Sequence, residues 1–170
     1  MSKKPARKQP HEARSNARLA AVQALYQMDI GSADIGDVLA QFHAPPDGHT
    51  FYDPETYELY YLPEASGQKG FEADADFFES IVRGVVEKQG DLDPAIDGAL
   101  AKGWRLPRLD ATLRAILRAG TFEIHGRSDV PPKTVINEYV TVAKAFFDGD
   151  EPKVVNAVLD RLARELLGEV

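Results

Sequence analysis

Two arginines and a tyrosine near the start of the chain are the residue types that hold single-stranded RNA. Arg14 and Arg18 are four residues apart, so on a helix they lie on one face, and Tyr26 follows eight residues later on roughly the same side. Such a face could neutralise phosphates with its cations while a base stacks on the ring. Alternatively, Tyr26 is an edge-of-core tyrosine with its hydroxyl in water. Arg18 is expected on the polar side, so that its loss would cost no more than ~0.5 kcal/mol of stability.

The charge of the chain is unevenly distributed. Residues 1–18 carry six Lys/Arg against Glu12, a net of +5, whereas residues 29–79 carry twelve Asp/Glu against one Lys, a net of −11. Lys8 belongs to the first group and extends it ahead of Arg14. A basic arm on an acidic body suggests an anionic polymer as partner, although the same pattern is typical of a solvated tail.

A second candidate site is the charged corner in residues 143–166, AKAFFDGDEPKVVNAVLDRLAREL. An apolar helix is expected to end near Phe147, and another begins after the acidic stretch. Asp150 and Pro152 favour a helix start, as an acid near the N-terminus and a first-turn proline. Lys153 could then face a phosphate, so the corner is either a binding surface or an ordinary interhelical turn.

Catalytic and metal-binding patterns are missing from the sequence. There is no cysteine, and the four histidines are scattered without the spacing of a metal site. No phosphate-binding glycine loop occurs, and the serines lack a nucleophile-elbow context. We therefore expect no catalytic residue, no metal and no cofactor, and a protein that is not an enzyme.

Helical periodicity predicts an all-α fold of about seven helices in a single domain spanning 13–170. Residues 1–12, with two prolines and little apolar content, are expected to form a mobile basic arm. Gly31 should end the first helix, Asp34 should cap the second, and Asp93 with Pro94 should open a new helix after 74–89. Residues 44–70, which are acidic and rich in tyrosine, read as an inserted loop.

The compartment is constrained by two observations. No apolar run approaches the ~20 residues of a membrane span, so no membrane partner is expected. The absence of cysteine fits a reducing environment, and we expect a cytoplasmic protein.

Two long blocks resemble the NusB family of transcription antitermination factors. They are RLAAVQALYQMDI (18–30) and RSDVPPKTVINEYVTVAKAFFDGDEPKVVNAVLDRLARE (127–165), and ILRAGTFEI (116–124) is similar to the family's central helix. The resemblance implies an all-helical, non-enzymatic protein that pairs with NusE, a small-subunit ribosomal protein. Together the two would hold a boxA element in nascent RNA and, with other Nus factors, help RNA polymerase resist termination, notably on ribosomal RNA operons.

The resemblance also implies an RNA-binding role for particular residues of this sequence. The family's RNA-contacting first helix corresponds to Arg14, Arg18 and Tyr26. The corner corresponds to Lys144, Asp150 and Lys153, near the family's RNA and partner surface. The sequence departs from the family where Ser15 and Asn16 interrupt the arginine cluster, and Lys8 with the other arm cations could compensate.

Two other functions remain open at this point. A similar domain serves some rRNA cytosine methyltransferases, which would require a fused catalytic domain. The chain could instead be a helical adaptor or homodimer that binds only protein, with the basic arm as a passive tail. Salt-dependent RNA affinity would distinguish the factor from the adaptor.

Overall fold

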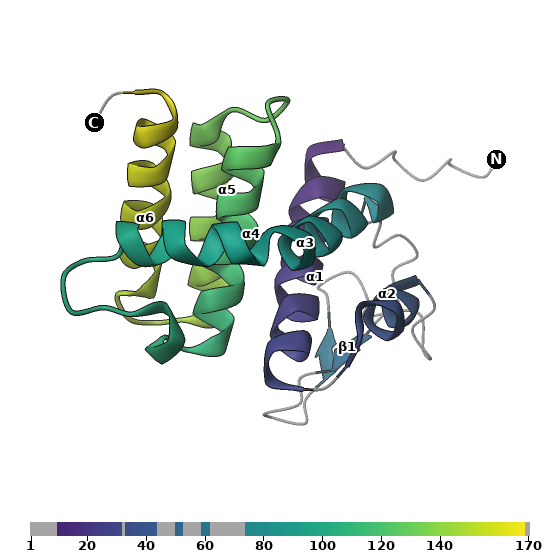
Figure 1. The fold of residues 1–170 in the computed structure, drawn as a ribbon. Helices are drawn as coiled ribbons and strands as arrows, with labels where there is room; N and C mark the ends of the chain where they lie inside the picture. Colours follow the sequence, from purple (N-terminus) through teal and green to yellow (C-terminus); the bar gives the residue numbers. More distant parts are fainter. Residues whose placement is uncertain (1–9, 32, 44–49, 53–58, 62–73, 169–170) are drawn as a thin grey trace.

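The computed structural model describes residues 10–31, 33–43, 50–52, 59–61 and 74–168. In this part of the chain six α-helices and one short 3₁₀ turn form a helical bundle (Figure 1). The helices are α1 (Pro10–Ile30), α2 (Ile35–His43), α3 (Ala75–Ala99), α4 (Ala111–Gly126), α5 (Pro132–Phe146) and α6 (Glu151–Leu166), with η1 (Leu106–Arg108) before α4. The all-α prediction is confirmed, with a helix count close to the expected seven.

Helix ends are set by the local signals that the sequence carries. The backbone N–H of Gly31 closes the last turn of α1 onto Gln27, and Asp34 accepts from the backbone N–H of Asp37 at 2.9 Å, which caps α2. Asp110 caps α4 in the same way through the N–H groups of Thr112 and Leu113. α1 begins at Pro10, earlier than expected, and the rest of the predicted mobile arm lies outside the described residues.

The helix start predicted at Asp93 and Pro94 is wrong. α3 runs unbroken for 25 residues with Pro94 inside it. Both carboxylate oxygens of Asp93 accept hydrogen bonds from Arg118 on α4, so this side chain is not free to cap a new helix. The two helices expected between 74 and 100 are therefore one.

The predicted loop at 44–70 contains two short strands. β1 (Thr50–Tyr52) and β2 (Leu59–Tyr61) pair antiparallel, with Phe51 opposite Tyr60. The remainder of the inserted segment lies outside the described residues. Within the described residues, β1 and β2 contact each other as a short antiparallel pair.

α4 is the central helix of the bundle. It contacts α1 and α3 on one side and α5 and α6 on the other, and every residue from Ala115 to Ile124 is buried. Close approach is built in by two glycines, because a Cβ on Gly84 of α3 would lie 2.2 Å from the Phe122 ring and one on Gly120 would lie 2.7 Å from Leu159. In the described residues no helix is both long enough and apolar enough to cross a membrane.

Candidate nucleic-acid interface

Arg18 lies in the core, so the expectation that it sits on the polar side of α1 is wrong. Only 2% of the residue is exposed. Its Nε and Nη2 donate to the two carboxylate oxygens of Glu123 on α4, both at 2.9 Å, and its Nη1 lies 3.7 Å from Glu138. A guanidinium bound on both sides inside the bundle is not available to a phosphate, so Arg18 holds α1 to α4 and α5.

Tyr139 on α5 completes this buried cluster. Its hydroxyl donates a short hydrogen bond to Glu123. Burial and then the charge of Glu123 raise the pKa of Tyr139 well above its ordinary value, which keeps the hydroxyl protonated and able to donate. Burial alone would lower the pKa of Arg18, but the hydrogen bond and charge of Glu123 outweigh it and raise that pKa, so the guanidinium remains charged.

Tyr26 is also packed inside the protein. Only 8% of it is exposed, so its ring is not an accessible platform for a base. Its burial supports a position in the core, but its hydroxyl is buried as well, so the expectation that the hydroxyl lies in water is wrong. The expected pairing of Arg18 with Tyr26 as a surface for RNA is therefore not formed.

Arg14, by contrast, reaches the surface at the N-terminal end of α1. Its side chain is 36% exposed, and its guanidinium carbon lies 4.6 Å from the centre of the Phe77 ring on α3. The start of α3 is tied to α1 because the backbone N–H of Asp74 donates to the carbonyl of Ala13 at 3.0 Å. This contact places the first turns of α1 and α3 side by side.

A further arginine, Arg127, lies beside Arg14. The sequence pattern did not identify it as a candidate binding residue. It is the residue directly after α4, and its guanidinium carbon lies 4.5 Å from the same Phe77 ring. Arg127 donates to both carboxylate oxygens of Asp129 at 3.2 and 3.3 Å, and Arg14 lies 3.5 Å from that carboxylate. The only hint in the sequence was the RSD triplet, which does not reveal that Arg14 lies nearby.

In the α5–α6 corner, which spans residues 147–150, residues 148–150 are exposed. Asp150 precedes α6 without a side-chain capping bond, and its carboxylate lies 3.7 Å from Lys153, both side chains being more than 85% exposed. Lys144 is exposed in the last turn of α5. An ion pair this exposed contributes little to stability, so these charges are free to interact with a partner.

The candidate residues do not form a single cluster. Arg14 is joined through Asp129 to the turn before α5, whereas Lys144, Asp150 and Lys153 lie at the other end of that helix. A helix of 15 residues is about 22 Å long, so the two groups are separated by that order of distance. An extended strand could reach both, but one phosphate could not. Lys8 lies outside the described residues.

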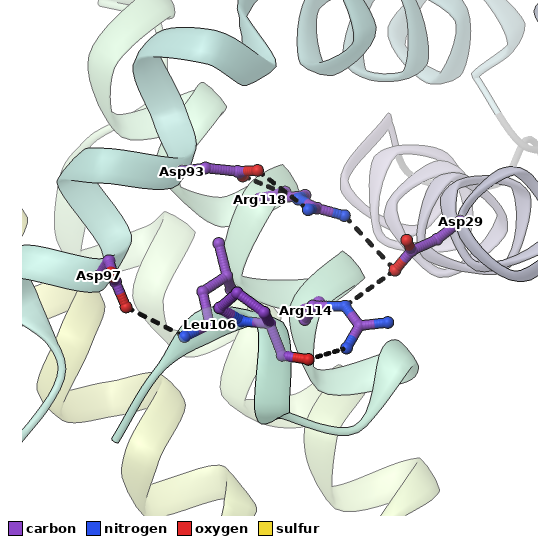
Figure 2. A pocket seen from close by; sticks show the side chains of 7 residues that line it. Asp29, Asp93, Asp97, Leu106, Arg114 and Arg118 are labelled. Carbon is purple, nitrogen blue, oxygen red and sulfur yellow. Dashed lines mark hydrogen bonds and ion pairs between the residues drawn. The ribbon is translucent and has the colours of Figure 1, made fainter. Parts of the chain in front are cut away.

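A separate polar hollow of about 350 Å³ lies where α1, α3 and α4 meet (Figure 2). Asp29, at the end of α1, accepts from Arg114 at 2.9 Å and lies 3.4 Å from Arg118, which also binds Asp93 on α3. Asp97 accepts from the backbone N–H of Leu106 at 3.0 Å. Each of these charged groups has a partner, and the ion pairs that line the hollow hold α1, α3 and α4 together.

Comparison with known proteins gives one consistent result. The model of the NusB family matches residues 15–164. A transcription antitermination protein NusB from Rhizobium rhizogenes is 53% identical over 156 residues, covering 92% of this chain and 89% of the relative. One from Maricaulis maris is 52% identical over 151 residues, covering 89% of this chain and 86% of the relative.

Solved structures agree with the fold. T. maritima NusB is 28% identical with a TM-score of 0.68, covering 94% of each chain. A structure of the antitermination factors NusB and NusE in complex with dsRNA matches with a TM-score of 0.66 at 20% identity, covering 90% of this chain and 97% of that one, which supports the shared fold. With the match extending from α1 through α6, this chain belongs to the NusB family.

Proposed function

We propose that this protein is a transcription antitermination factor that binds boxA-type single-stranded RNA in nascent ribosomal RNA together with NusE. The observation that carries the proposal is the family match over residues 15–164, with relatives above 50% identity that bear the antitermination name. In this role it joins other Nus factors on the elongating RNA polymerase. It acts by binding, without catalysis, and works in the cytoplasm, where transcripts emerge.

The RNA-binding residues that we propose are Lys8, Arg14, Lys144 and Lys153. The three described cations are at least partly exposed. Asp150 reduces the attraction of the corner for RNA because its negative charge lies beside Lys153. Arg18 and Tyr26 support this surface from within the bundle and do not contact the RNA.

The charge of the protein predicts modest affinity when it acts alone. A net charge of −7 opposes RNA, so a few local cations must provide the attraction, and the NusE-type partner should strengthen the complex. With roughly four phosphates neutralised, log affinity should fall with log salt at a slope of about −3.

Filter binding with a salt titration, with and without the NusE-type protein, tests this function. A boxA-like RNA should bind with the stated slope and more tightly when the partner is present. A slope near zero, with the partner still bound, would favour the protein-binding adaptor. The antitermination name of the relatives, which is not that of a methyltransferase, supports the factor over an RNA-binding domain of such an enzyme.

A further inference from the structure

We propose that Arg14 and Arg127 form a phosphate site for the RNA backbone, and that Asp129 occupies this site when RNA is absent. The inference rests on the proposed function and adds one binding residue and one internal competitor to it. It concerns the surface where the N-terminal ends of α1 and α3 meet the turn between α4 and α5.

The two arginines come from distant parts of the chain and meet at one carboxylate oxygen. Nη2 of Arg127 donates to Oδ2 of Asp129 at 3.3 Å, and Nη2 of Arg14 lies 3.5 Å from the same atom. Nε of Arg127 donates to the other oxygen, Oδ1, at 3.2 Å. A carboxylate held in this way occupies the position that a phosphate oxygen would take between two guanidinium groups.

The guanidinium groups are held in place independently of Asp129. Both contact the Phe77 ring, and Nη1 of Arg127 also donates to the hydroxyl of Ser80 at 3.1 Å. Because these contacts remain when the carboxylate leaves, the two cations keep their positions. A prearranged pair of cations loses little conformational entropy when it binds a phosphate.

The local charge explains why the site is closed in the free protein. Arg14 and Arg127 contribute +2, and Asp129 together with Asp74, which lies 3.9 Å from Arg14, contributes −2. Asp74 is committed to capping α3 through the N–H of Phe77, whereas Asp129 is half exposed and lies in a turn. The hydrogen bond from Arg127 lowers the pKa of Asp129, so this competitor remains charged at neutral pH.

The nearby Arg18 cannot serve as a third phosphate ligand. It lies 4.8 Å from the Phe77 ring but is bound to Glu123 inside the bundle. The site is therefore made of two arginines, and removal of the Asp129 charge should leave it with a net charge of +1. Such a change should strengthen phosphate binding and increase its dependence on salt.

The test compares Asp129→Asn with Asp91→Asn, which removes the same charge from an exposed position on α3. Affinity for a boxA-like single-stranded RNA is measured by filter binding across a salt series, and melting curves verify folding. We expect Asp129→Asn to bind about threefold more tightly than Asp91→Asn, as for removing one charge about 6 Å from a phosphate in water. The salt slope should steepen by about 0.7 for each added phosphate contact.

Two further measurements make the result decisive. Adding Arg127→Gln to Asp129→Asn should abolish the gain, whereas an equal gain in the double variant would overturn the proposal. The arginine Nε–Hε NMR signals of Asp129→Asn are also titrated with inorganic phosphate. If wild-type protein binds no RNA, the proposed function fails, but shifts confined to Arg14 and Arg127 would still support the anion site. If RNA does bind, equal RNA affinity of Asp129→Asn and Asp91→Asn would refute the proposal. In either case, the absence of phosphate-induced shifts at Arg14 and Arg127 would refute it.

Discussion

Replacement of Arg18 by methionine should destabilise the protein strongly, because it leaves the Glu123 carboxylate buried without its cation. Glu123 is fully buried and receives two hydrogen bonds from Arg18 at 2.9 Å. Removing one partner of a buried ion pair costs about 3–5 kcal/mol, many times the ~0.5 kcal/mol expected for an exposed arginine. At about 2–4 °C per kcal/mol for a chain of this size, the melting temperature should fall by about 6–20 °C.

The matched control for this prediction is the double variant Arg18→Met with Glu123→Gln. The glutamine keeps the shape of the side chain and can still accept from the Tyr139 hydroxyl, but it carries no charge. If the uncompensated charge causes the loss, the double variant should recover a large part of the melting temperature. If the melting temperature of Arg18→Met decreases by less than about 2 °C while RNA binding weakens, Arg18 is an exposed RNA ligand and this reasoning is wrong.

Three further predictions concern the corner and the helix crossing. Asp150→Asn should lower stability by ~0.3–1 kcal/mol through the helix dipole yet tighten RNA binding; lower stability with unchanged affinity, measured on one sample, would make the corner a plain turn. Lys153→Gln should weaken RNA binding and reduce the salt slope by about 0.7, whereas an unchanged slope would exclude a phosphate contact. Gly84→Ala should cost ~1–3 kcal/mol on melting because its Cβ would meet Phe122 at 2.2 Å, while Gly90→Ala, with open space around it, should be neutral or stabilising.

The helices were predictable where a local signal determines them. Gly31 and Asp34 mark helix ends because the capping groups and the bonds they complete are neighbours in the chain. The prediction of a helix start at Pro94 was wrong because the preceding Asp93 resembles an N-cap residue. Only its contact with Arg118, 25 residues away, shows that Asp93 has another partner. The local sequence pattern does not show that Arg118 binds the carboxylate that would otherwise cap a helix.

The binding surface was harder to predict because it depends on long-range pairs. Arg14 and Arg18 look alike in sequence, four residues apart on one helix. Their different environments come from Glu123, which lies 105 residues beyond Arg18, and from Asp129 beside Arg14. Arg127 escaped notice for the same reason, since its place beside α1 requires the whole bundle to be assembled.

The central position of α4 has a consequence for the order in which the chain can fold during synthesis. Domains generally fold as units as they emerge from the ribosome. α1 and α3 are made before α4, but α5 and α6, which cover its other side, are made after it. Until Leu159 emerges to fill the space beside Gly120, an apolar side of α4 remains open to chaperones. In the finished protein, the amides of α4 should exchange with deuterium among the slowest, because their exposure requires both sides of the bundle to open.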